Sequence, residues 1–160
     1  MEVQIEKVKK GPIKGFSCLR EASEREGFRS LLRLEEEWQN GTNTFSQPGE
    51  ALFTIWGNGS LIGIGGINQD PYSRDKEVGR LRRFYIMASF RGQGIGSMLL
   101  LWILKNHWGF FEEIRLRTDS EKAAKFYERH GFQKVKNDPT CSHKMLRDTN
   151  FGQKYRNIIY

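Results

Sequence analysis

The stretch RGQGIGSMLL, Arg91–Leu100, decides the fold because it places three glycines in five positions directly before an apolar run. The preceding residues, Val78–Met87, alternate as a strand does, with an arginine-rich first half. Apolar residues then recur at helical spacing, which predicts a buried helix that stops near Gly109. These residues are Ile95, Met98, Leu99, Trp102 and Ile103. The stretch therefore predicts a strand, a glycine loop and a buried helix in succession.

A glycine loop at the start of a helix is a general recipe for binding an anion. The first N–H groups of a helix have no partner within it, and the helix dipole adds partial positive charge there. Glycine lets the backbone approach a ligand closely. The ATP-binding P-loop pattern fails, because no Lys-Ser or Lys-Thr follows these glycines. The dinucleotide pattern fails as well, because Ser97 stands where its third glycine belongs.

The rest of the chain alternates strands and helices. The turn at Asn58-Gly59 predicts a hairpin between two apolar runs. Gly27 either weakens or splits a helix expected over Ser23–Trp38. The other expected elements are a first strand from Val3, a strand over Glu113–Thr118, a helix capped by Thr118 or Ser120 and ended by Gly131, and closing strands at 132–136 and 142–146. This order predicts one α+β domain with a mixed sheet over residues 1–147, and a tail at 148–160 packed on the domain or on a partner.

Composition narrows the class of protein. The chain has 160 residues and a formal net charge of +7, which suits a polyanion or a phosphorylated ligand, although its basic residues are spread along the whole chain. Cys18 and Cys141 form no disulfide framework, zinc spacing or nucleophile pattern, and the three histidines have no metal-ligand spacing. We find no signal peptide and no apolar run long enough to span a bilayer, so we expect a reduced, cytoplasmic protein.

Two motifs resemble a known family. The pattern R-x-x-G-x-G (Arg91, Gly94, Gly96) follows a strand, and AAKFYERHGF (123–132) lies about thirty residues downstream after one more strand. Together with the element order, they resemble the GCN5-related N-acetyltransferases, the GNAT family. The resemblance implies a central, mostly antiparallel sheet whose parallel fourth and fifth strands splay apart, flanked by helices. It also implies acetyl-CoA as co-substrate and no metal.

The resemblance implies a set of cofactor-binding residues. Backbone groups near the end of the strand before the loop would pair with the pantetheine arm, and the loop amides would bind the pyrophosphate. Ser120 stands where the family often has an asparagine that touches the cofactor. The implied residues are Tyr85, Ile86 and Met87 on the strand, Arg91, Gly92, Gln93, Gly94, Ile95, Gly96 and Ser97 on the loop, and Ser120.

The resemblance also assigns catalytic roles. Tyr127 occupies the position of the general acid that protonates the departing thiolate; the alternative is a core aromatic on an apolar helix face. The family's usual general base is a carboxylate at a position held here by Arg80. Glu77 is the substitute that we expect to act through water, with a solvated strand-end charge or deprotonation by solvent as alternatives. A backbone N–H near Ile86 would stabilise the oxyanion.

The sequence does not identify the acceptor of the acetyl group. The acidic LEEEW (34–38) suits a cation, whereas the arginines of GRLRRFY (79–85) suit an acidic acceptor such as an amino acid carboxylate. A small amine, an amino acid, a peptide N-terminus and a protein lysine are all compatible. The rival to an N-acetyltransferase is a non-catalytic acyl-CoA sensor of the same fold; nucleic-acid or membrane binding is not expected. A homodimer formed through a sheet edge or the tail is possible.

Overall fold

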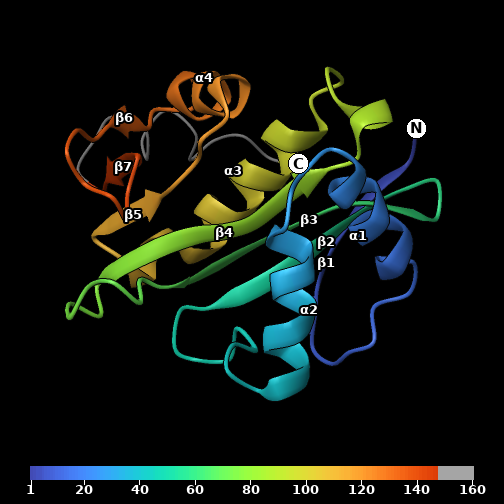
Figure 1. Cartoon of the computed structure of the whole chain (residues 1–160), viewed down its shortest axis with the longest axis horizontal. Helices are drawn as coiled ribbons and strands as arrows, with labels where there is room; N and C mark the ends of the chain where they lie inside the picture. The colour runs from blue at the N-terminus through green and yellow to red at the C-terminus, as the bar shows by residue number, and fades with distance from the viewer. Residues whose placement is uncertain (148–160) are drawn as a thin grey trace.

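A computed structural model describes residues 1–147. Its seven strands form one sheet in the order β1-β2-β3-β4-β5-β7-β6 (Figure 1). The strands are β1 (Val3–Lys7), β2 (Ala51–Gly57), β3 (Ser60–Gln69), β4 (Val78–Ile86), β5 (Glu113–Leu116), β6 (Gln133–Lys134) and β7 (His143–Leu146). The helices are α1 (Phe16–Arg25), α2 (Ser30–Asn40), α3 (Ile95–His107) and α4 (Glu121–Arg129), with short 3₁₀ turns η1 (Ala88–Phe90) and η2 (Trp108–Phe110).

The β2-β3 hairpin follows the sequence prediction. Asn58 and Gly59 both have positive φ angles, 49° and 81°, and Gly57 pairs with Ser60 across the turn. These angles match the two-residue turn whose twist suits paired strands. The hairpin therefore places β3 next to β4, the strand that leads into the glycine loop.

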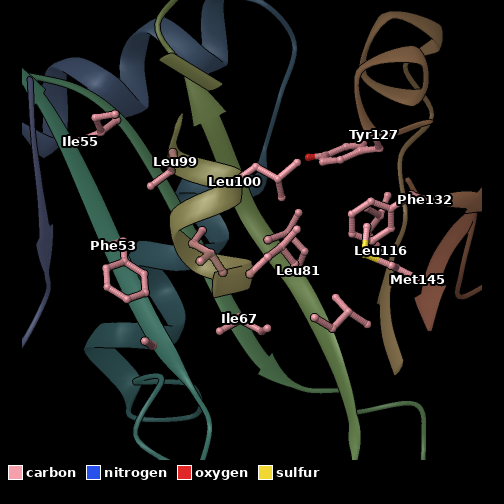
Figure 2. Packing of buried hydrophobic residues seen from close by; sticks show 14 of the residues in the cluster. Phe53, Ile55, Ile67, Leu81, Leu99, Leu100, Leu116, Tyr127, Phe132 and Met145 are labelled. Atoms are coloured by element: carbon pink, nitrogen blue, oxygen red, sulfur yellow. The ribbon is translucent and has the colours of Figure 1, made fainter. Parts of the chain in front are cut away.

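Two clusters of buried side chains cover the two faces of the sheet. On one face α3 packs on β2, β3 and β4 through residues such as Leu99, Leu100 and Ile103, and this cluster continues to Tyr127 of α4 (Figure 2). On the other face Leu19 of α1 and Leu31 of α2 pack on Ile64 and Tyr85. Both faces bury apolar area, which is the dominant stabilising contribution in a domain of this kind.

The parallel strands β4 and β5 pair over only three residues. The pairs are Val78 with Glu113, Gly79 with Ile114 and Arg80 with Arg115, whereas β4 continues to Ile86. The same strand contains a bulge against β3, where Arg83 adopts a φ of 58°. The splayed fourth and fifth strands and the mixed, mostly antiparallel sheet that the sequence predicted are thus confirmed.

The first helical region differs from the prediction. The chain forms two helices that flank Gly27, whose φ is 86°, and α1 begins at Phe16 instead of near Ser23. The expected start was wrong because the fully buried side chains of α1 are only Leu19 and the small residue Ser23, with Phe16 partly buried against the same cluster, so its periodicity is weak. The predicted tail at 148–160 lies outside the described residues. Among residues 1–147, every helix is too short or too polar to cross a membrane.

Candidate active site

The N-terminus of α3 presents a run of unpaired backbone amides. The first backbone amide of the helix with a partner belongs to Met98, which donates to the carbonyl oxygen of Gly94 at 3.0 Å. The six amides of 92–97 make no hydrogen bond to another described residue. No side chain caps this helix, and Gly94 itself stands at the N-cap position. Such a helix end attracts an anion, because its donors converge on the positive end of the dipole.

Two of the three loop glycines have a conformational reason to be glycine. Gly92 and Gly94 have φ angles of 75° and 79°, which side chains with a Cβ rarely adopt, and a Cβ at either would meet no atom within 4 Å. A Cβ at Gly96 would make only ordinary van der Waals contact, 3.4 Å from the ring of Phe126 on α4. Gly92 and Gly94 therefore leave an open cradle above the amides.

The end of β4 directs one residue toward the side where β5 has separated. The amide of Met87 donates to the carbonyl of Ile62 on β3 at 2.8 Å, so Met87 faces β3. Alternation along the strand then turns the backbone of Ile86 away from β3. The Ile86 carbonyl accepts from Nε of Arg91 at 2.9 Å. Of the three strand residues implied by the resemblance, Ile86 is the one whose backbone faces the opening.

Arg91 is clamped to the turn between α1 and α2. Its two terminal nitrogens donate to both carboxylate oxygens of Glu26 at 2.7 and 2.8 Å, and the Tyr85 hydroxyl donates to the same carboxylate at 2.5 Å. The hydrogen bond from Arg91 lowers the pKa of Glu26. Burial and the neighbouring Glu26 raise the pKa of Tyr85 to about 12. This clamp joins the glycine loop to the opposite layer of helices.

Tyr127 lies in an aromatic group between α4 and the sheet. Its ring meets Phe84 of β4, Phe126 and Phe132 edge-on, with centroid distances of 6.2, 5.2 and 5.7 Å. Figure 2 shows its hydroxyl directed toward Leu100 of α3. The hydroxyl makes no hydrogen bond to another described residue, and burial raises its pKa. The phenol is therefore fully protonated at neutral pH and free to donate.

Ser120 caps α4. Its Oγ accepts from the amide of Ala123 at 3.2 Å, and its own amide donates to Thr118 Oγ1 at 3.1 Å. Ser120, of the two candidates, is thus the N-cap residue. A contact between Ser120 and a cofactor stays a prediction.

The structure does not bring Glu77 to this group. Glu77 precedes β4, at the end where β4 and β5 are still paired, and its carbonyl accepts from the amide of Glu112 at 2.7 Å. The length of β4 separates it from Ile86, roughly 25–30 Å along the strand. The side chain is exposed, and the neighbouring Glu112 carboxylate raises its pKa. A role as general base stays a prediction, and the structure offers no contact in its favour.

The sequence analysis missed two acidic partners. Glu26 pairs with Arg91, and Glu37 of α2 pairs with Arg83 of β4. Both lie in the helical region that was expected over Ser23–Trp38, but no spacing rule relates a carboxylate there to an arginine 46 or 65 residues later. A third pair, between buried Asp70 and Arg80, joins the loop before β4 to that strand. Arg80, which stands at the position of the family's usual general base, therefore forms an ion pair with Asp70.

Comparison with known proteins agrees with this geometry. The family described as Acetyltransferase (GNAT) family matches residues 16–132. The uncharacterized N-acetyltransferase YjgM of Escherichia coli K12 is 27% identical over 124 residues, which cover 72% of this chain and 71% of that protein. A candidate acetyltransferase from Exiguobacterium sp. 255-15 is 27% identical, with a TM-score of 0.82 over 92% of this chain and 95% of its own.

A further solved structure shares the fold at lower identity. The PaiA N-acetyltransferase of Thermoplasma acidophilum, solved in complex with coenzyme A, is 18% identical, with a TM-score of 0.66 over 91% of this chain and 99% of its own. The family match covers most of the chain and includes both the glycine loop and Tyr127. The chain is a member of the GNAT family of acetyltransferases, and thus an acyltransferase.

Proposed function

We propose that this acyltransferase moves an acetyl group from acetyl-CoA to a primary amine by direct attack within a ternary complex. The observation that carries the proposal is the run of six unpaired amides, 92–97, above a cradle kept open by glycine. A diphosphate suits this run, because several amides can donate to its charged oxygens. Such hydrogen bonds are roughly twice as strong as neutral ones. The structure of PaiA with coenzyme A lends support from a relative of the same fold.

The end of β4 supports binding of the pantetheine arm beside the loop. An extended chain that entered where β5 has separated would meet the backbone of Ile86, and Tyr85 and Met87 would flank it. The amide of Ile86 is then placed to donate to the oxygen that becomes negative when the amine attacks. The Arg91 side chain, already bound to Glu26, would shape this entry and bind phosphate only by leaving that partner.

The reaction balances with one protonated phenol. The amine nitrogen forms a bond to the thioester carbon, the carbon–sulfur bond breaks, and the sulfur takes the proton of the Tyr127 hydroxyl. The ammonium form of the amine gives one proton to water before it attacks, the nitrogen gives a second to water as the amide forms, and solvent returns one proton to Tyr127. The hydroxyl of Tyr127 supports this role, because it is protonated at neutral pH and makes no hydrogen bond to another described residue that a ligand would have to break. No carboxylate takes part in this scheme.

Substitution of Tyr127 by phenylalanine tests the proposal. Titration calorimetry with coenzyme A should give an unchanged dissociation constant, because the ring packing is kept. Thiol release from acetyl-CoA across a panel of amines should fall by about 10²–10⁴-fold, the range expected for loss of a general acid. Binding without thiol release by the wild type on any amine would instead favour the acyl-CoA sensor. Unchanged turnover in the variant would remove Tyr127 from the mechanism.

A further inference from the structure

We propose that the acceptor amine also carries a carboxylate, and that Arg82 binds it. This inference rests on the proposed function and adds to it the class of acceptor. Its basis is a row of arginines on β4, Arg80, Arg82 and Arg83, that begins where the pairing with β5 stops. Two of the three have an acidic partner, and the third has none.

Arg82 lies on the face of the sheet that is covered by α1 and α2. It pairs with Gly66 of β3, and residues paired across two strands share a face. A Cβ at Gly66 would contact the ring of Phe45, which belongs to the cluster formed by α1 and α2. Arg82 therefore lies on the layer opposite α3 and two residues beyond the last pair with β5. A substrate that reached the opening from this layer would pass it.

Arg82 is half-buried and unpaired. It makes no ion pair or hydrogen bond to another described residue. Its neighbours differ, because Arg80 lies 3.9 Å from the buried carboxylate of Asp70 and Arg83 is bound to Glu37. The charge of Arg82, after burial itself, lowers the pKa of Arg83, and it also lowers the pKa of Arg80. A positive charge that repels the two neighbouring arginines does not stabilise the fold, so stability alone does not explain Arg82.

The neighbouring Arg83 adds an unused donor to the same face. Its Nε is buried without a hydrogen-bond partner on a side chain that is only 8% exposed, whereas Nη1 of Arg80 faces the Asp70 carboxylate at 3.9 Å. A buried donor left unpaired is costly, and native proteins seldom leave one without a reason. Asp70 is already shared by Arg80 and Arg115, and Glu37 is bound to Arg83, so Arg82 has no carboxylate among the described residues and one on the substrate would supply it. The planar fork of arginine matches a carboxylate in geometry as well as in charge.

The test compares amino acids with the amines that they become on loss of the carboxylate, such as lysine with cadaverine and phenylalanine with phenethylamine. Thiol release from acetyl-CoA gives kcat and KM for each member of a pair. We expect the carboxylated member to have a kcat/KM at least about tenfold higher in the wild type. Arg82→Ala should raise KM for that member about 10- to 100-fold and leave KM for its decarboxylated partner unchanged.

Three controls separate binding from folding. Arg82→Gln should melt no lower than the wild type, because no described residue loses a partner, whereas a structural role for Arg82 would lower its melting temperature. Arg82→Lys should recover part of the effect, because the charge is kept and the fork is lost. Lys105→Ala removes one exposed positive charge from α3, on the other face, and should change neither KM.

The outcomes distinguish this inference from the proposed function. Equal rates for both members of every pair, or an equal effect of Arg82→Ala on both, would overturn the carboxylate and leave the acetyltransferase intact. If coenzyme A binds but no amine reacts, direct transfer fails. The carboxylate is then tested by calorimetry of N-acetyl amino acids and N-acetyl amines on the protein loaded with coenzyme A. Binding of the former that Arg82→Ala abolishes would support the inference, and no such binding would overturn it.

Discussion

The N-termini of α3 and α4 differ in how their free amides are satisfied. At α4, Ser120 accepts the amide of Ala123 and Glu121 stands in the first turn, so both the donors and the dipole are partly satisfied within the chain. At α3, Gly94 occupies the N-cap position, no side chain caps the helix, and the first turn contains no acidic residue. The same electrostatic preference applies to both helix ends. Only the end of α4 receives a hydrogen-bond acceptor and a negative charge from the chain itself.

A missing cap does not by itself mark a ligand site, because α1 and α2 also lack a side-chain cap and an acidic first turn. What sets α3 apart is the run of six amides, 92–97, without a partner among the described residues. A cap at α3 would stabilise the fold by about 1 kcal/mol, the usual value of an N-cap side chain. The chain forgoes this contribution at its most apolar helix, where packing against the sheet already holds the helix in place. The α4 helix is short and more polar and keeps its cap.

The largest effect is expected for Gly94→Ala, with Gly41→Ala as the matched control. Gly94 and Gly41 have φ angles of 79° and 77°, and a Cβ at either meets nothing within 4 Å. Both variants should therefore lose about 1–2 kcal/mol of unfolding free energy from the left-handed backbone, measured by denaturant titration. Only Gly94→Ala should also weaken coenzyme A binding, by tenfold or more in calorimetry, because its methyl group enters the cradle. Equal affinities in the two variants would contradict the assignment of the loop.

The second prediction removes the cap of α4. Ser120→Ala should lower the unfolding free energy by about 1 kcal/mol, since the amide of Ala123 loses its acceptor. Coenzyme A affinity should stay within twofold of the wild type, which is the reverse of the pattern at Gly94. A parallel loss of affinity would instead assign Ser120 to the cofactor, as the family resemblance implies.

The smallest effect concerns the clamp beside the mouth of α3. Glu26→Gln should cost about 0.5–1 kcal/mol at neutral pH, a value kept low because both partners of the pair are partly exposed. The pKa of Glu26 is lowered in the folded state, so its contribution is present above the ordinary value of 4.5 and is lost as pH falls through the folded value. Unfolding free energies of wild type and variant should therefore converge as the pH is lowered through that folded value. A constant difference at all pH values would show that charge is not its source.

Much of the fold followed from local signals. The hairpin at Asn58-Gly59, the strand–loop–helix unit around Gly94 and the cap at Ser120 all depend on a few adjacent residues whose conformational preferences are strong. The start of α1 escaped prediction because its inward side chains are few and small. Tyr127 was found through its motif, which no argument from periodicity alone distinguishes from a core aromatic.

The candidate site was harder to predict from the sequence where its parts come from distant segments. Glu26 and Arg91 are 65 residues apart in sequence and bind each other through two hydrogen bonds. The sequence does not distinguish the three arginines of β4. In the folded protein Arg80 and Arg83 each lie beside a carboxylate, and Arg82 does not. Glu77 is near the loop by count, but an extended strand carries it to the far end of the sheet.

The sequence by itself determined the order of the elements, the glycine loop before an uncapped helix and the family, because glycine, capping and apolar periodicity act within a turn or two of the chain. Only the tertiary structure decided where β4 and β5 part, which carboxylate holds Arg91 and which arginine stays unpaired. Those features depend on how far each strand is paired and on charges brought together across the sheet, and no local preference encodes a distance between segments that meet only after folding.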